Sequence, residues 1–166
     1  KQLNQLAKEC EVCALGDSRS INQHLKECGT CGDYREKAEI FNETLKEIRK
    51  LASKEEFVRH RELHMRISKM ATMDEDERVE SFNGLLDAIA ILPEEDRVKM
   101  VKTRTDVLVE FPKYERDPMI KTMSEVAKDW DNDRKRTEKS TLNKATEDFP
   151  IYKKLMIRNL LGKIME

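Results

Sequence analysis

Two consecutive segments of equal length read LPEEDRVKMVKTRTDVLVE (residues 92–110) and FPKYERDPMIKTMSEVAKD (residues 111–129). Each begins with a large apolar residue followed by proline, and five residues after that start comes an arginine, Arg97 or Arg116. Proline is favoured at the first position of a helix and cannot continue one, so it marks a boundary. The two segments therefore predict two helices of about 16 residues joined by very short connections.

The same pattern runs from residue 73 to the end of the chain without a gap, with a period of about 19 residues. Its apolar start residues are Met73, Leu92, Phe111, Trp130 and Phe149, and each is followed by proline or aspartate. A continuous helix would rotate its apolar stripe by about 100° per segment, but the repeated breaks end the helix at the same place each time. We therefore predict an all-α fold, in which short helices form a small helical-repeat array or an irregular bundle.

Two alternatives qualify this interpretation. The first is that the spacing is a coincidence of helix lengths and not a true repeat. The second concerns the segment that begins at Trp130, because residues 134–140 are polar almost all round, as in a partly disordered linker.

Composition agrees with a helical protein. Of 166 residues, 39% are charged and only 5% are aromatic, with 5 glycines and 4 prolines, which excludes most sheet-rich folds. The net charge of −1 creates no global field toward nucleic acid or anionic membrane. No apolar run approaches the roughly 18 to 20 residues that span a bilayer, and the N-terminus lacks the apolar core of a signal peptide. We expect a cytoplasmic protein that does not bind membranes.

Ahead of the repeats, a heptad spacing predicts one long helix. Its apolar seam consists of Tyr34, Ala38, Phe41, Leu45, Ile48 and Ala52. Two capping boxes, Ser53 with Glu56 and Thr72 with Glu75, predict the starts of two further helices.

All four cysteines fall early in the chain, in two Cys-x-x-Cys pairs, Cys10 with Cys13 and Cys28 with Cys31. Pairs about 15 residues apart match the spacing that closes around one tetrahedral zinc ion, and zinc prefers sulfur and imidazole ligands. The sequence therefore predicts a closed, structural Zn²⁺ site. It belongs to a finger at residues 1–34, which precedes an all-helical domain at residues 35–166. Two disulfides or four free thiols are the alternatives.

Five candidate ligands compete for four places: Cys10, Cys13, His24, Cys28 and Cys31. A capping box at Ser20 predicts a helix from about Ile21, which puts the last three candidates on one face. Three ligand sets stay open: Cys10, Cys13, His24 and Cys28; Cys10, Cys13, Cys28 and Cys31; or His24, Cys28, Cys31 and one upstream cysteine. Cys28 belongs to all three sets.

The stretch His24-Leu-Lys-Glu-Cys28-Gly-Thr-Cys31, followed by a helix, resembles the His-x-x-x-Cys-x-x-Cys signature of zinc-binding anti-sigma factors. The resemblance implies that these three residues bind zinc with one upstream residue, and that the helical domain wraps a sigma factor. In that family the upstream ligand usually lies farther from the histidine than it does here.

The segment from Cys10 to Cys28 is similar to a second family, the Cys-Cys-His-Cys fingers of ubiquitin-binding repair proteins. There the loop is commonly one residue longer, and an acidic residue commonly stands where this chain has Lys26. Both resemblances cover only about residues 8–40.

Charge is distributed unevenly along the helical domain. Residues 73–96 sum to −8 and residues 134–166 sum to +5. We interpret these stretches as solvated helix faces that complement one another, and the alternative is a basic surface for nucleic acid or an acidic partner. For the last segment, Ile151 to Met165, core or oligomer packing is the first interpretation. A helix that binds a membrane surface or a groove in a partner is the second.

Glu56, His60 and His64 step by four along one predicted helix face, so His60 and His64 are candidates for a second metal site. The order differs from the His-Glu-x-x-His motif of metalloproteases. We therefore interpret both histidines as exposed or core-edge residues.

The sequence contains no phosphate-cradling glycine loop and no nucleophile elbow, and we predict that the protein is not an enzyme. It favours a zinc-binding regulatory or adaptor protein, anti-sigma-like, that acts by binding another protein. One alternative is a nucleic-acid-binding zinc protein that uses residues 134–166. The other is a redox sensor based on zinc and thiols. Formation of a homo-oligomer stays open.

Overall fold

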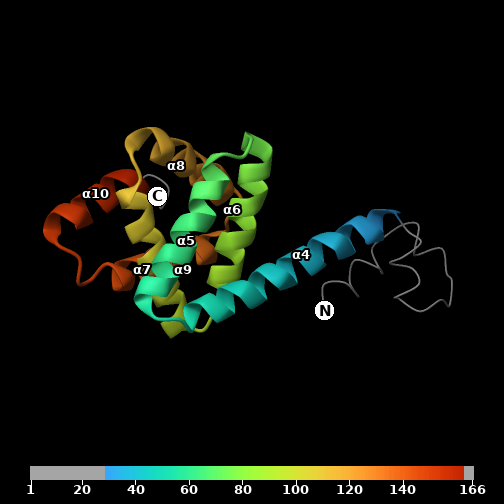
Figure 1. Cartoon of the computed structure of the whole chain (residues 1–166), viewed down its shortest axis with the longest axis horizontal. Helices are drawn as coiled ribbons and strands as arrows, with labels where there is room; N and C mark the ends of the chain where they lie inside the picture. The colour runs from blue at the N-terminus through green and yellow to red at the C-terminus, as the bar shows by residue number, and fades with distance from the viewer. Residues whose placement is uncertain (1–28, 163–166) are drawn as a thin grey trace. The chain divides into compact units, whose positions relative to one another are not determined.

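The computed structural model describes residues 29–162, with side chains from Glu36 onward, and every regular element in that range is a helix (Figure 1). The helices are α4 (Gly29–Ala52), α5 (Glu56–Ala71), α6 (Glu75–Ala90), α7 (Glu94–Glu110), α8 (Lys113–Lys128), α9 (Asn132–Ala145) and α10 (Ile151–Leu161). The all-α prediction is therefore confirmed for the part of the chain that the structure describes.

The chain divides into two compact units, Lys1–Glu43 and Thr44–Glu166. The division falls inside α4, which is one continuous helix of 24 residues, as the heptad spacing predicts. The second unit begins with the last turns of α4, where Leu45, Ile48 and Ala52 are buried. We refer to those turns together with α5–α10 as the array.

The helices of the array begin at equal intervals along the sequence. The starts predicted by the repeated proline or aspartate are confirmed: Glu75, Glu94, Lys113, Asn132 and Ile151. The interval also reaches one step further back, because α5 begins at Glu56. The capping box at Ser53 predicted a helix here, but the repeat pattern did not include it, because Lys54 and Glu55 stand where later segments have an apolar residue and a proline or aspartate.

We number every segment from its start, so that position 1 is Lys54, Met73, Leu92, Phe111, Trp130 and Phe149. Position 2 is the residue just before each helix. There the carboxylates of Asp74 and Asp131 accept hydrogen bonds from the backbone N–H of Glu77 (2.9 Å) and Arg134 (2.7 Å). Proline fills position 2 before α7, α8 and α10, with extended ψ angles of 149–151°. Each proline therefore lies just before its helix, and not at the first helical position, where the sequence predicted it.

The helices predicted after Ser53 and Thr72 are confirmed, but the two capping boxes themselves are not formed. The hydroxyl of Ser53 donates to the carbonyl oxygen of Lys50 (2.7 Å), and that of Thr72 donates to the carbonyl oxygen of Lys69 (2.8 Å). Both side chains therefore bind carbonyl groups in the last turn of the preceding helix, and not the free N–H groups of the next one.

The fourth segment is a helix and not a linker. In α9, Glu138, Thr141 and Ala145 are buried, although most of its other side chains face water. The segment looks polar all round because its buried face is itself built from polar residues.

From α5 to α9, helices two apart along the chain pack most closely, and the array therefore has two layers (Figure 1). The most extensive pairings are α5 with α7, α7 with α9, and α6 with α8. Consecutive helices such as α5 and α6 touch over a smaller area. This is the arrangement of a helical-repeat array.

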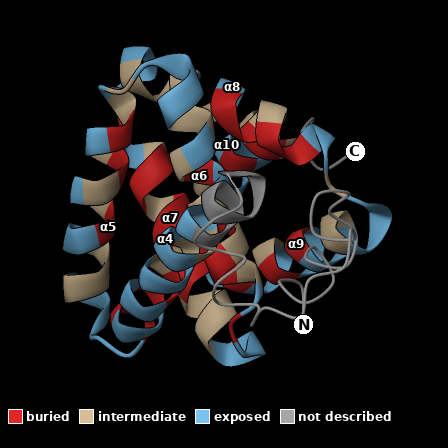
Figure 2. Ribbon diagram, turned by 90° about the vertical axis from the view of Figure 1, so that its right-hand side faces the viewer, coloured by how far each residue is buried: buried red, intermediate tan, exposed pale blue. Residues whose placement is uncertain are grey.

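Opposite sides of each helix serve its two neighbours in the layer (Figure 2). Positions 9 and 12 are buried in α7, α8 and α9: Met100, Thr103, Met119, Thr122, Glu138 and Thr141. Positions 10 and 14 are buried in α5, α6 and α7: Leu63, Ile67, Phe82, Leu86, Val101 and Thr105. The same positions are exposed where the described array ends, at Glu62 and Met65 on α5 and at Lys139 and Asn143 on α9. Positions 9 and 12 thus face the helix two before, and positions 10 and 14 face the helix two after.

Polar contacts repeat in the same register. Arg78 Nε donates to Thr122 Oγ1 (2.9 Å), and Arg97 Nε donates to Thr141 Oγ1 (3.1 Å), so position 6 meets position 12 of the helix two further on. Each of these guanidinium groups also binds the carbonyl oxygen at position 1 of its own segment (3.1 and 3.3 Å). Arg78 and Arg97 therefore each connect the boundary before their own helix to the next helix of the same layer.

A second contact recurs between helices three apart. Arg134 forms an ion pair with Asp87 (3.3 Å) and Lys153 forms one with Asp106, in both cases between position 5 and position 15. Contacts that recur at equal spacing favour a true repeat over a coincidence of helix lengths.

The most buried ion pair joins the middle of α7 to α9. Arg104 donates to Glu138 Oε1, and their side chains are only 1% and 4% exposed. Arg104 Nε and Nη1 are buried and have no hydrogen-bond partner among the described residues. The pair is thus only partly satisfied, and each charge depends on the other.

Replacing Arg104 with methionine is therefore expected to lower the free energy of unfolding by about 3 to 5 kcal/mol, because Glu138 would stay buried without its cation. Urea denaturation followed by circular dichroism measures the change. The double variant R104M/E138L should recover most of the loss, since it removes both buried charges. A loss below about 1 kcal/mol in the single variant, a size typical of surface pairs, would contradict the buried pair.

Gly84 lies in the middle of α6, at position 12, where α7, α8 and α9 have threonine. A Cβ atom placed there would meet nothing within 4 Å. Gly84→Ala is therefore expected to stabilise the protein by about 0.5 to 1 kcal/mol, because glycine loses more backbone freedom on folding than alanine. The shift of the thermal unfolding midpoint measures this change. A decrease in the midpoint would show that the fold does not tolerate a Cβ atom at residue 84.

Candidate functional site

The predicted zinc ligands are mostly beyond the described residues. Cys10, Cys13, His24 and Cys28 precede them, and Cys31 lies in the first turn of α4, where the structure gives the backbone only. From residue 36 to residue 162, no group of three or more His, Cys, Asp or Glu side chains is placed to hold a metal ion. The zinc site therefore stays a prediction.

The two histidines proposed for a second metal site are engaged in other contacts. His60 Nε2 lies 2.8 Å from Glu110 Oε2, at the end of α7. The ring of His64 stacks on the ring of Phe111, with centroids 4.7 Å apart and planes at 20°. Both side chains are half-buried. They are therefore core-edge residues, and they connect α5 to the boundary between α7 and α8.

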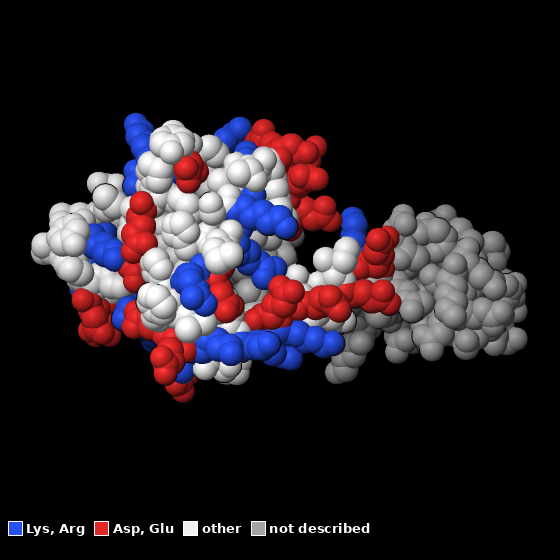
Figure 3. Space-filling model, viewed as in Figure 1, with Lys and Arg blue, Asp and Glu red and all other residues white. Residues whose placement is uncertain are grey.

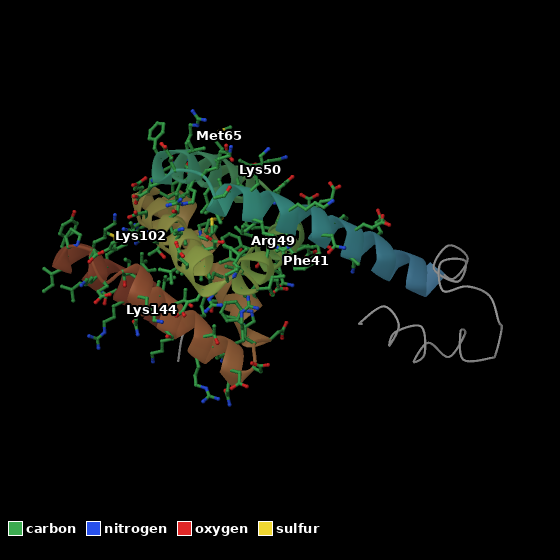
Figure 4. The ribbon with its side chains drawn as sticks, turned by 90° about the horizontal axis from the view of Figure 1, so that it is seen from below. Phe41, Arg49, Lys50, Met65, Lys102 and Lys144 are labelled. Carbon is green, nitrogen blue, oxygen red and sulfur yellow. The ribbon has the colours of Figure 1, made fainter. Side chains whose placement is uncertain are left out.

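The acidic first turns of α6 and α7 are joined to lysines on later helices. Lys121 donates to Glu75 Oε1 (2.9 Å), and this hydrogen bond, together with the lysine's charge, lowers the pKa of Glu75. Lys144, labelled in Figure 4, lowers the pKa of Glu94 in the same way. The predicted charge complementarity between helix faces is therefore present at these contacts.

The basic stretch at residues 134–166 is also partly neutralised within the fold. Four of its bases form ion pairs with acids: Arg134 with Asp87, Arg136 with Asp133, Lys144 with Glu94, and Lys153 with Asp106. On the face shown in Figure 3, positive and negative side chains are interspersed over the array. Nucleic-acid binding by this stretch stays a prediction. Because four of its bases are paired, fewer of them are free to bind phosphate groups than the sequence alone indicates.

A polar hollow of about 410 Å³ lies between α7 and α9. It is lined by Glu94, Arg97, Asp133, Arg136, Thr137, Ser140 and Thr141. Arg97 is bound to Thr141 there, and Arg136 is paired with Asp133. Glu94 is paired with Lys144, so each charged group that lines the hollow already has a partner within the fold.

Four large apolar side chains are exposed together on α10: Ile151, Tyr152, Leu155 and Met156. Elsewhere in the array the exposed large apolar residues are fewer on each segment and farther apart, as with Phe57 and Met65 on α5 and Tyr114 on α8. Only Ile157 and Leu161 of α10 are buried, so the core-packing interpretation of this segment holds for those two residues. The exposed face of α10 is the strongest candidate for a binding surface among the described residues.

Comparison of the chain with known protein families, with curated proteins and with solved structures finds no match. Among the described residues, no helix combines the length and apolar character needed to cross a membrane.

Replacing Lys121 with methionine is expected to raise the pKa of Glu75 toward its ordinary value of 4.5, because the hydrogen bond and the positive charge are both lost. A lowered pKa stabilises the fold above the unfolded-state pKa, and this contribution disappears as pH falls through the folded-state pKa. The variant should therefore lose stability at neutral pH and depend less on pH in the acid range.

A carbon-detected NMR titration of the glutamate carboxyls measures the shift directly. Lys139→Met is the matched control, because Lys139 is an exposed lysine on α9 with no contact to Glu75. An unchanged Glu75 titration in K121M would disprove the contact between α6 and α8.

Proposed function

We propose that this chain is a zinc-binding regulatory or adaptor protein of the cytoplasm that acts by docking on another protein, and not by catalysis. The observation that carries the proposal is the concentration of five candidate ligands, Cys10, Cys13, His24, Cys28 and Cys31, in one short stretch of a chain that has no other cysteine. Thiolates and imidazole at this spacing suit a closed tetrahedral zinc site.

The helical array supports the docking half of the proposal. Repeat arrays present extended surfaces formed by successive helices, and such surfaces are well suited to binding other macromolecules. Here the charged side chains in the first turns of α6 and α7 are largely paired within the fold, while α10 presents apolar side chains to water. The resemblance of residues 24–31 to anti-sigma factors favours the same kind of activity.

In this proposal zinc holds the finger together and does not react. Four of the five candidate side chains bind the ion as thiolates or as a neutral imidazole, and Cys28 is a ligand in every set. The fifth candidate is spare. A closed site of this type contributes about 10 to 16 kcal/mol of apparent binding energy to its own small module.

Native mass spectrometry of the full chain, purified without added metal, is expected to show one zinc per molecule. Cys28→Ser should abolish zinc binding. Of the single variants C10S, C13S, H24A and C31S, the one that replaces the spare ligand should retain zinc. The double variant H60A/H64A is the matched control and should retain zinc, because the structure places His60 and His64 in contacts with Glu110 and Phe111.

Chelation is expected to expose the four thiols and to unfold residues 1–34 while the array keeps its own unfolding transition, since its core lies within residues 44–162. Thiol counting and circular dichroism before and after chelation measure both effects. A metal-free protein with two disulfides would overturn the zinc site and the cytoplasmic assignment together.

A further inference from the structure

The outward face of α10 differs from the same face of the other segments. In α6, α7, α8 and α9, positions 3, 4, 7 and 8 hold mainly charged or polar residues, such as Glu94, Glu95 and Lys99 on α7. In α10 all four positions are apolar: Ile151, Tyr152, Leu155 and Met156. They are 78%, 70%, 55% and 40% exposed.

This face is not the one that a further repeat would cover. The side that receives the helix two further on consists of positions 10 and 14, which are Phe82 and Leu86 in α6. In α10 these positions are Arg158 and Gly162. The exposed apolar residues therefore lie outside the packing scheme of the array.

α10 also lacks one of the polar contacts that join the other helices. Position 12 is Leu160 in α10, where α8 and α9 have a threonine that accepts a hydrogen bond from an arginine. Arg116, the arginine at position 6 of α8, has a buried Nε without a partner among the described residues. α10 instead packs on α7, where Lys153 binds Asp106.

The apolar face has a positively charged edge. On a helix, residues four apart share a side, so Ile151 with Leu155 and Tyr152 with Met156 form two parallel apolar rows. Lys154 and Arg158 form the adjacent row. Lys154 Nζ donates to the backbone carbonyl oxygen of Glu147, but neither cation of this row forms an ion pair with a described acid. Residues 151–161 themselves include no acid.

We propose that the exposed face of α10 is a docking surface for an amphipathic helix of another protein, with apolar residues that cover Tyr152 and Leu155 and acidic residues that pair with Lys154 and Arg158. This inference rests on the proposed docking function and names the class of partner. It does not depend on zinc.

Charge decides between this occupant and the others. In a second copy of the chain, α10 would bring the same cationic edge, and a pairing of two α10 helices holds no acid within residues 151–161 to offset it. A flat anionic membrane would have to approach Glu147 and Asp148, which are exposed in the turn just before α10, together with the two cations, whereas a single helix laid along residues 151–158 need not cover that turn. An acidic helix satisfies both the apolar rows and the cationic edge.

The test uses the full chain and three fluorescein-labelled peptides of about 16 residues, a length at which an isolated helix can form in water. The peptides share a leucine face, spaced as in an amphipathic helix, and carry net charges of −4, 0 and +4 on the other residues. Fluorescence anisotropy should give a Kd for the −4 peptide at least about tenfold below that for the +4 peptide. Raising the salt concentration should narrow the difference, because exposed charges are screened.

Two substitutions and two matched controls locate the surface. Leu155→Ser should weaken binding of the −4 peptide about tenfold or more, whereas Phe57→Ser, at an exposed apolar residue on α5, should not. Arg158→Glu should weaken the −4 peptide and strengthen the +4 peptide, whereas Lys139→Glu on α9 should change neither. All four residues are exposed, and thermal melts confirm that each variant is folded.

Several results would overturn the proposal. Equal affinity for the three peptides, no binding at about 100 μM, or equal losses in the Leu155 and Phe57 variants would each do so. A dimer in native mass spectrometry that Leu155→Ser dissociates would assign the face to a second copy. Binding to vesicles of phosphatidylcholine and phosphatidylserine that Leu155→Ser abolishes would assign it to a membrane.

The same titration after chelation separates this inference from the zinc proposal. Peptide binding that persists without metal supports α10 docking whether or not residues 1–34 hold zinc. Peptide binding that disappears on chelation would show that the surface lies in the finger and not on α10.

Discussion

The array depends on the break that ends every helix at the same point of each segment. Without it, a continuous helix would turn its apolar stripe by about 100° per segment, and no single face could stay buried. Pro93, Pro112 and Pro150 hold extended backbone just before α7, α8 and α10, and Asp74 and Asp131 cap α6 and α9 by accepting a hydrogen bond from a free N–H. Because the helix starts are equally spaced, the same positions meet in each successive pair of helices within a layer.

Polar groups fix the register of those layers. Apolar side chains such as Met100 and Met119 fill space without demanding one partner, whereas the Arg97 guanidinium binds the Thr141 hydroxyl and a carbonyl oxygen at its own helix boundary. The buried pair of Arg104 and Glu138 adds a demand of the same kind, because neither charge is tolerated alone in the core. Specific pairing thus comes from groups that contribute less to net stability than the apolar core does.

The sequence was sufficient where one residue decides a local structure. Proline and aspartate at position 2 predicted five helix starts, whereas the residue before α5 is Glu55, whose side chain forms no capping hydrogen bond. The capping boxes failed because the hydroxyls of Ser53 and Thr72 bind equally well to the preceding helix. α9 looked like a linker because periodicity counts apolar residues, whereas its buried face relies on Glu138 and Thr141.

For the candidate surface, sequence reasoning identified the residues but not their side of the helix. Ile151, Leu155 and Ile157 are equally apolar, and only the packing of α10 on α7 separates the buried residue from the exposed ones. Once the repeat register is known, however, Arg158 at position 10 and the apolar residues at positions 3 and 7 already distinguish α10 from the other segments. In a repeat protein, a departure from the repeat can thus be recognised from the sequence after a single structure has fixed the register. Function is best sought at such departures, because the positions that obey the repeat are already occupied by neighbouring helices.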